Sequence, residues 1–175
     1  MEESMEEEKT LLNATLCLLV KNDKVLLAFK TRKIGKDKFN GYGGGIEAGE
    51  TPRQAAAREL RQESAGVIVL PEDLEKIAIV EFHNTKEDGS CFICRMHVYL
   101  VYKWKGIPKP SEEMIRPTWF PKDQLPIAQM MLADKEWMPF VLAGQKIMAK
   151  ASYGPFQRNL LGEVEIQKVE SLPEN

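Results

Sequence analysis

Two glutamates on one predicted helix have the spacing needed to hold a metal ion. Glu59 and Glu63 are four residues apart, so a helix places both carboxylates on one face, with Gln62 beside them. The segment GYGGG, from Gly41 to Gly45, comes shortly before this helix, and a glycine-rich backbone lets carbonyl and amide groups approach a ligand closely. Mg²⁺ prefers oxygen ligands and is commonly bound together with substrate phosphates. The stretch therefore suggests a site that holds Mg²⁺ against a diphosphate.

The same residues also fit an ordinary surface helix. Glu59 and Glu63 would then be solvated, with Arg58 and Arg61 as their charge partners. Like charges at this spacing destabilise a helix slightly unless something positive lies between them. From composition alone, the solvated face is the favoured interpretation.

The overall composition is typical of a soluble globular protein. The chain has 175 residues, enough for one domain with a sizeable core, of which 43% are hydrophobic and 29% charged. Its net charge is −2, and the stretch MEESMEEE at the start contributes five of the acids. A balance so close to zero does not indicate nucleic acid as a partner. We expect residues 1–10 to be a disordered acidic tail and residues 11–175 to form a single domain.

The sequence predicts neither a membrane span nor a secretory signal. No apolar run approaches the roughly 20 residues that a membrane helix needs, and the acidic start differs from the basic and then apolar start of a signal peptide. We therefore expect a cytoplasmic protein without a membrane partner. We also expect it to be a monomer.

The pair Cys91 and Cys94, with His83 and His97 nearby, has residue types that could bind zinc. The surrounding segment SCFICRMHVYLVY is nevertheless rich in aromatic and β-branched residues, which is typical of a strand. Side chains three residues apart on a strand face opposite ways. Core packing is therefore the favoured interpretation.

The apolar patterns predict a mixed sheet. Short apolar runs, several rich in β-branched and aromatic residues, are bounded by turn residues such as Asn22-Asp23, and the glycines and charges of residues 31–45 indicate a loop. The predicted strands are residues 15–20, 24–30, 76–82, 92–104, 116–121 and 160–169.

Two helices are predicted to pack on this sheet. Thr51, Pro52 and Gln54 are typical of a helix start, and Gly66 of a helix end. An apolar stripe predicts a second helix over residues 134–150, with Pro139 in or near its first turn. The chain is thus expected to be a single α+β domain.

The spacing around the first helix resembles the Nudix box, G-x5-E-x7-R-E-U-x-E-E-x-G-U, where U is a bulky apolar residue. The chain departs from this pattern at Gln62, where a glutamate is expected, and at Ala65-Gly66, where a glycine followed by an apolar residue is expected. The resemblance implies the Nudix fold, an α/β/α sandwich with a mixed β-sheet in which the box forms a loop–helix–loop. The matching residues are Gly44, Glu50, Arg58, Glu59, Leu60 and Glu63.

The resemblance also implies a metal site. Glu59, Glu63 and the Gly43 carbonyl would bind Mg²⁺, with Mn²⁺ as a substitute ion. Gln62 would offer a carbonyl oxygen but no charge. Glu113, outside the box, would be a further ligand or the base that helps to activate water.

Three neighbouring residues receive supporting or rival roles. Arg58 would hold the box glutamates in place, and Glu50 would brace the loop. Glu112 is a rival for the role of Glu113, because the segment EEMIRP carries one extra residue.

From about Thr15 to Tyr153 the chain is similar to Nudix hydrolases that act on oxidised purine nucleoside triphosphates. The similarity implies a small nucleotide as partner and hydrolysis to the monophosphate and pyrophosphate. Ala133 stands where that group has a second aspartate, and Met131 where it has a lid tryptophan. The positions that match its nucleotide-binding residues are Thr15, Lys30, Asn40, Phe82, Met114, Met131, Asp134 and Trp137.

Plainer roles remain open for several of these residues. Asp134 could cap the helix that follows it, Asn40 could bond to its own backbone, and Met131 and Trp137 could be core residues. Two other functions also remain open. One is hydrolysis of another diphosphate, such as ADP-ribose or a dinucleotide polyphosphate. The other is nucleotide binding without catalysis, for which Gln62 is the only hint.

Overall fold

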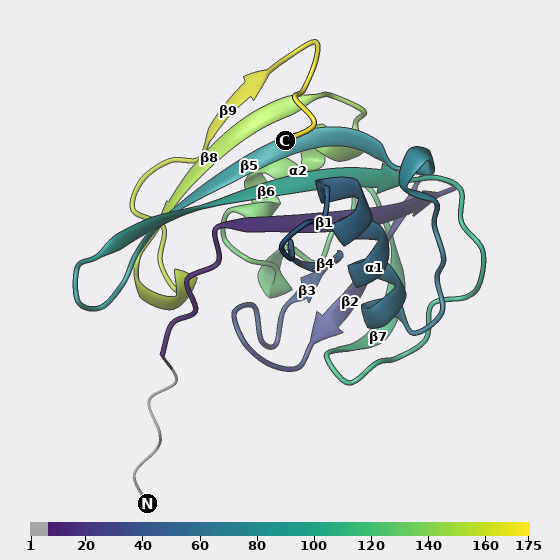
Figure 1. Cartoon of the computed structure of the whole chain (residues 1–175), viewed down its shortest axis with the longest axis horizontal. Coiled ribbons are helices and arrows are strands. Elements are labelled where there is room, and N and C mark those ends of the chain that lie inside the picture. Colours follow the sequence, from purple (N-terminus) through teal and green to yellow (C-terminus); the bar gives the residue numbers. More distant parts are fainter. Residues whose placement is uncertain (1–6) are drawn as a thin grey trace, which may run out of the picture.

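Nine strands form one mixed sheet in the computed structural model, which describes residues 7–175 (Figure 1). The sheet runs in the order β3-β2-β1-β6-β5-β8-β9, and β4 pairs with β1 and β7 with β2. β1 is parallel to β6 and β5 is parallel to β8, while the other pairs are antiparallel. The strands are β1 (Asn13–Lys21), β2 (Lys24–Lys30), β3 (Phe39–Asn40), β4 (Tyr42–Gly45), β5 (Glu75–Thr85), β6 (Cys91–Val101), β7 (Met114–Pro121), β8 (Ile147–Tyr153) and β9 (Glu165–Lys168).

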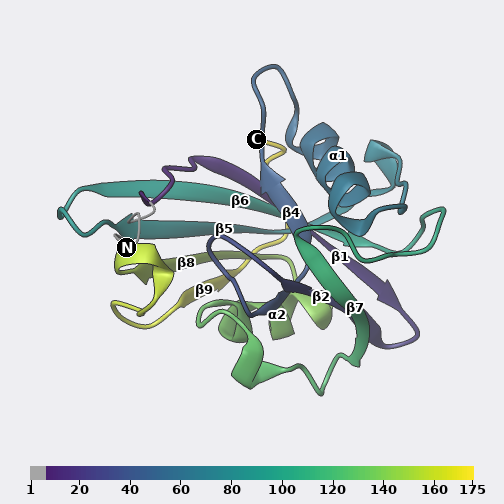
Figure 2. The same ribbon diagram turned by 90° about the horizontal axis from the view of Figure 1, so that it is seen from below.

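The two helices, α1 (Pro52–Ser64) and α2 (Asp134–Leu142), lie on opposite faces of the sheet, as Figure 2 shows. Side chains of strand β1 pack against both helices, because they alternate between the two faces of the sheet. Leu16 and Leu18 pack in the cluster that contains Trp137 of α2, and Cys17 and Leu19 pack in the cluster that contains Leu60 of α1. The predicted α/β/α sandwich is confirmed. Three short 3₁₀ turns, Pro71–Asp73, Ile127–Gln129 and Pro155–Gln157, complete the connections.

Helix α1 has the extent that its sequence predicts, but a different residue terminates it. Thr51 accepts a hydrogen bond from the Gln54 amide, and the Gln54 side chain accepts one from the Thr51 amide, which forms a capping box. The helix ends at Ser64, before Gly66 as predicted, but the residue that takes the left-handed conformation there is Ala65, with φ 54° and ψ 31°, and not the glycine. Ala65 thus occupies the position where the Nudix pattern has glycine, and it bears the steric cost that glycine avoids.

Replacement of Ala65 by Gly is expected to stabilise the protein. The left-handed conformation costs an alanine about 1 kcal/mol or more, and exposed Ala65 has little packing to lose. Because glycine also loses more backbone entropy on folding, we expect a net gain of about 0.5 kcal/mol, or roughly 1–2 °C in Tm. Thermal unfolding measures it. Ala57→Gly, the same change inside α1, should lower Tm, and a loss of stability in A65G would contradict the assignment.

Helix α2 is shorter than predicted. It ends at Leu142, and residues 147–153 form β8 instead of continuing the helix. Gly144 adopts a positive φ of 82°, which ends the helix, and the residues that follow alternate between buried and less buried positions, which is the period of a strand. Pro139 is also misplaced by the prediction, since it lies inside the helix rather than in its first turn.

The predicted loop over residues 31–45 contains two short strands, β3 and β4. Strand β4 consists of Tyr42 and three glycines and pairs with β1. A side chain at Gly43 would overlap the carbonyl oxygen of Thr15, so only glycine allows the two backbones to approach this closely. Glycine content normally argues against a strand, and this is why the sequence pattern concealed β4.

The cysteines and the N-terminal region complete the description. Cys94 is buried and Cys91 is exposed, so the two thiols do not face a common ligand. Of the predicted acidic tail, residues 1–6 lie outside the described part of the chain; residues 7–10 form neither helix nor strand, and Glu8 is buried. Among residues 7–175, no helix is long and apolar enough to cross a membrane.

Candidate active site

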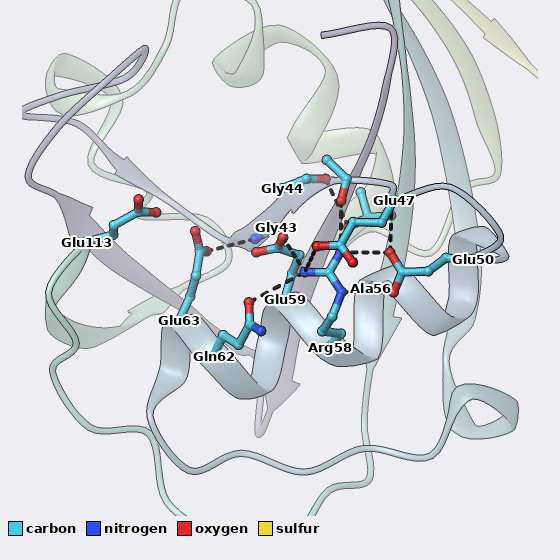
Figure 3. A network of polar contacts seen from close by, with 12 residues as sticks. Gly43, Gly44, Glu47, Glu50, Ala56, Arg58, Glu59, Gln62, Glu63 and Glu113 are labelled. Carbon is cyan, nitrogen blue, oxygen red and sulfur yellow. Dashed lines mark hydrogen bonds and ion pairs between the residues drawn. The ribbon is translucent and has the colours of Figure 1, made fainter.

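Arg58 organises the acidic face of α1. Its guanidinium forms two hydrogen bonds of 2.8 Å with the two carboxylate oxygens of Glu50, one of 2.8 Å with Glu59 Oε1, and one of 3.1 Å with the Gly45 carbonyl (Figure 3). A longer bond of 3.4 Å reaches Gln62 Oε1. A planar guanidinium holds several oxygens in fixed directions. Arg58 therefore ties the loop to the helix and orients the Glu59 carboxylate.

Glu63 lies one turn farther along α1 and is buried. Its Oε2 accepts a hydrogen bond of 3.0 Å from the Gly43 amide, which joins the helix to β4. Burial raises the pKa of Glu63 to about 8, and the neighbouring charge of Glu59 acts in the same direction. At Gly44, a side chain would lie 2.6 Å from the Glu59 carboxyl carbon, so the glycine leaves room for that carboxylate. The loop and helix thus confine the carboxylates of Glu59 and Glu63 close enough together for their charges to repel.

Glu113 approaches this pair from the start of β7. Its side chain is 21% exposed, whereas that of Glu112 is 85% exposed. The charge of Glu113 contributes to the raised pKa of Glu63. The geometry therefore favours Glu113 over Glu112 as the third carboxylate. In Figure 3 Glu113 lies beside Glu63, on the side away from Glu59, and its Oε1 accepts hydrogen bonds from Arg32 and Lys33.

The chemistry of these donors fits a hard divalent cation. Confined carboxylates with mutual repulsion are stabilised by a cation between them, and Mg²⁺ takes such oxygen ligands. Across residues 7–175, however, no three His, Cys, Asp or Glu side chains are arranged as a finished metal site. In this arrangement Arg58 holds Glu59, the Gly43 amide holds Glu63, and two cations hold Glu113.

A second polar group lies on the α2 side of the sheet. Asp134 is 4% exposed, and its two oxygens accept hydrogen bonds of 3.1 Å each, from Asn40 Nδ2 and from Trp137 Nε1. Asn40 Oδ1 in turn accepts a bond of 2.8 Å from the Gly41 amide, which fixes the orientation of the Asn40 amide. Burial raises the pKa of Asp134 to about 6, against the effects of both hydrogen bonds.

These contacts decide among the plainer roles considered for the same residues. Asp134 is the first residue of α2, and the cap position is Ala133, so Asp134 is not the helix cap. Asn40 does bond to the neighbouring backbone, and it also donates to Asp134. Trp137 is fully buried in the core, and its indole N–H is used by Asp134. Met131 is half-buried.

Lys30 connects the two polar groups. Burial lowers its pKa, and the charges of Glu63, Glu113 and Asp134 oppose that effect, so its ammonium lies within electrostatic reach of both. A side chain built at Gly35 would lie 3.5 Å from Lys30 Cδ and 3.8 Å from Met131 Sδ. The loop after β2 therefore covers Lys30 and Met131 together.

Tyr153 is a member of this group that the sequence did not reveal. Its ring stacks on Phe82 with centroids 6.0 Å apart, and its hydroxyl accepts a hydrogen bond of 2.7 Å from the Ala133 amide. It thereby links the aromatic wall to the start of α2. The alternation of buried residues along residues 147–153 was the available signal, but the helix predicted over residues 134–150 overlaps the first part of this strand and hid it.

Thr15 and Met114 lie apart from the Asp134 group. Thr15 is buried on β1 and donates a weak hydrogen bond of 3.4 Å to the Gly44 carbonyl. Met114 packs in the cluster beneath α1, not in the one that contains Trp137. The predicted nucleotide-binding residues are therefore divided between two groups: one around Glu59 and Glu63, called the metal side below, and one around Asp134, called the base side. Two surface cavities, of about 570 and 730 Å³, lie elsewhere, around Glu174 and around His83.

Comparison with known proteins identifies the family. The family model of the NUDIX domain matches residues 10–141. The chain belongs to the Nudix family. It is 36% identical over 159 residues to a Danio rerio protein named oxidized purine nucleoside triphosphate hydrolase, covering 90% of this chain and 96% of that protein. A Mus musculus protein of the same name is 37% identical over 132 residues, covering 75% and 80%.

The structural comparison gives the same Nudix architecture. A MutT protein from Bacillus halodurans matches with a TM-score of 0.74 and 25% identity, covering 89% of this chain and 97% of that one. Nudix hydrolases generally use divalent metal ions. The face formed by Arg58, Glu59 and Glu63 is therefore the Nudix helix of this protein, with Gln62 in place of one box glutamate.

Proposed function

We propose that this Nudix protein hydrolyses oxidised purine nucleoside triphosphates, such as 8-oxo-dGTP, to the monophosphate and pyrophosphate. The reaction would use Mg²⁺, with Mn²⁺ as a substitute, and would remove damaged nucleotides from the precursor pool. Two relatives of 36% and 37% identity are named for this activity. The protein would act as a cytoplasmic monomer on a small-molecule substrate.

One observation carries the choice of substrate. A buried carboxyl group, Asp134, is held by Asn40 and Trp137, and Lys30 lies within electrostatic reach of both Asp134 and the Nudix carboxylate Glu63. Such a carboxyl group can accept from, or when protonated donate to, the polar edge of a base. A site built to pair with polar groups rejects analogues that lack them, because its own buried groups would be left unpaired.

The metal side would carry out the hydrolysis. Glu59, Glu63 and the Gly43 carbonyl are assigned as ligands, and a bound divalent ion would neutralise phosphate oxygens and favour attack by water. Arg58 keeps Glu59 in place. Glu113 would serve as the further ligand or as the base that accepts a proton from water, because a carboxylate within hydrogen-bond reach can do so. Gln62 can add one neutral oxygen.

The base side would recognise the purine. Asp134 is buried and bonded to Asn40 and Trp137, so neighbouring side chains would have to move for a purine to reach it. Met131 offers a flexible apolar contact in place of an aromatic lid. Phe82 supplies an aromatic wall, and Thr15 and Met114 complete the positions assigned to nucleotide binding.

Release of the nucleoside monophosphate in the presence of Mg²⁺, followed by chromatography, tests the proposal, because a triphosphate and ADP-ribose both yield a monophosphate whereas ADP-ribose yields no pyrophosphate. The substrates are 8-oxo-dGTP, 2-oxo-dATP, dGTP, dATP, their ribose forms and ADP-ribose. We expect an oxidised purine triphosphate to have a kcat/KM at least about ten-fold above that of its ordinary counterpart. Activity confined to ADP-ribose would keep the metal side and discard the assigned base side. The absence of turnover with every compound would instead indicate a nucleotide-binding protein.

A further inference from the structure

Two exposed cations, Arg32 and Lys33, hold the carboxylate of Glu113, the third carboxylate assigned to the metal side. Arg32 donates from Nε at 2.9 Å and lies with Nη2 at 2.8 Å from Glu113 Oε1, and Lys33 Nζ lies 3.0 Å from the same oxygen. Arg32 also reaches Glu112 with Nη1 at 3.4 Å. All three contacts to Glu113 converge on one oxygen. We call Arg32 and Lys33 the cation latch.

The backbone fixes the latch next to Glu113. The Thr31 amide donates to the Glu113 carbonyl at 2.9 Å, and the Thr31 hydroxyl donates to the Glu112 carbonyl at 2.8 Å. Lys30 and Met114 are also paired across β2 and β7. The chain at residues 30–31 is thereby tied to the start of β7, and the two cations that follow must emerge beside Glu113. Only their side chains are free to change partners.

We propose that the cation latch holds Glu113 in the free protein and binds the distal phosphates of the substrate when Glu113 turns to the metal side. The inference rests on the proposed function in one respect: it assumes a substrate with a di- or triphosphate chain. It assigns Arg32 and Lys33 as phosphate-binding residues. When these two cations exchange Glu113 for phosphate, Glu113 becomes free to join Glu59 and Glu63 as a metal ligand.

The charges place the two arrangements in competition. A divalent cation on either oxygen of the Glu113 carboxylate would lie close to the guanidinium and the ammonium that contact Oε1, which brings like charges together. The side chains of Arg32 and Lys33 are 49% and 60% exposed. Exposed ion pairs change an equilibrium constant by at most about five-fold, so the latch can be exchanged for stronger contacts.

The released cations would meet an anion close by. A phosphate chain bound against Glu59 and Glu63 brings several negative oxygens to the same side of the sheet. The planar guanidinium of Arg32 can bond two phosphate oxygens at once, and Lys33 can act as a point charge. Metal binding and phosphate binding would then reinforce each other, because each removes a competitor of the other.

A double variant, Arg32→Ala with Lys33→Ala, separates this role from a structural one. Calorimetry with Mn²⁺ alone should show metal binding about five-fold tighter than in the unaltered protein, because Glu113 is no longer held. Titration of the Mn²⁺-loaded protein with inorganic tripolyphosphate should show binding at least about ten-fold weaker, because two charged contacts are lost. A merely structural role would weaken both.

Lys36→Ala with Lys38→Ala is the matched control. It removes the same charge from the same loop, and neither lysine is among the cations that contact Glu113. We expect both affinities to change less than two-fold in this variant. Unchanged or weaker Mn²⁺ binding in the Arg32/Lys33 variant, or unchanged tripolyphosphate binding, would overturn the inference. Neither titration uses a nucleotide base, so failure of the proposed substrate in the hydrolysis assay remains a separate result.

Discussion

Replacement of Glu63 by Gln is expected to reduce kcat by roughly 10³-fold or more, while the protein remains folded. A charged ligand that neutralises and orients phosphate contributes several kcal/mol to the transition state, and about 4 kcal/mol corresponds to this factor. Glutamine keeps an oxygen that can accept from the Gly43 amide, so the link between α1 and β4 can persist. Pyrophosphate release at saturating Mg²⁺ measures the effect.

The stability of the metal-free variant provides a second measurement. Burial raises the pKa of Glu63 from 4.5 to about 8, so the native state keeps its proton to a higher pH than the unfolded chain does. The unaltered protein therefore loses stability from this group as the pH rises from about 4.5 to about 8. Glutamine does not titrate, and the metal-free variant should melt no lower than the unaltered protein at pH 8.

Glu47→Gln is the matched control for this prediction. Glu47 is 71% exposed and lies 3.8 Å from Arg58, so the change removes an equal charge near the same network without touching an assigned ligand. We expect kcat to change less than two-fold. An E63Q variant that retains more than about a tenth of the activity would remove Glu63 from the proposed ligand set.

The parts of the site that lie close together in sequence could be predicted from it. The capping box of Thr51 and Gln54 and the common face of Glu59 and Glu63 depend on spacings of three and four residues, which the helix alone determines. The Nudix pattern extended this to Arg58. The local conflict at Ala65 was visible as a departure from that pattern, but the structure was needed to show which residue takes the left-handed conformation.

The parts that depend on distant pairing could not be predicted in this way. Strand β4 exists because Gly43 can lie against Thr15, and local glycine content predicts the opposite. The bond between Asn40 and Asp134 joins residues 94 positions apart. The contact of Arg32 with Glu113 spans 81 positions and was missed altogether, since nothing in either segment specifies the other.

The shortened α2 is a different kind of error. The apolar residues from Trp137 onward fit a helical stripe, and the same stretch from Ile147 fits an alternating strand. Gly144 separates the two patterns, but an isolated glycine is also tolerated inside helices. Pairing of β8 with β5 decides the outcome, and it brings Tyr153 next to Phe82.

Replacement of Asp134 by Asn is expected to reduce the preference for oxidised over ordinary purine triphosphates by about 10- to 100-fold. Both oxygens of Asp134 accept hydrogen bonds, and the Gly41 amide prevents Asn40 from turning its own amide around. An asparagine would place an NH₂ group against one of the two donors, and such an unpaired buried group costs about 1–3 kcal/mol. The ratio of kcat/KM values for the two substrate classes measures the change.

The pH dependence of a second ratio, kcat/KM for a guanine-type over an adenine-type triphosphate, gives the sharper test of Asp134. Its pKa is raised by burial to about 6, so the group is mainly a carboxylic acid below this pH and a carboxylate above it. Only the carboxylate is purely an acceptor, which suits the N–H donors of a guanine edge, whereas the acid can donate to an acceptor. Selectivity for a guanine-type base should therefore rise as the pH passes about 6 in the unaltered protein. This rise should be absent in Asp134→Asn.

Glu136→Gln, an equal charge change at an exposed position of α2, should keep the rise in selectivity near pH 6. A rise that persists in D134N would assign the titration to another group and leave Asp134 with a structural role.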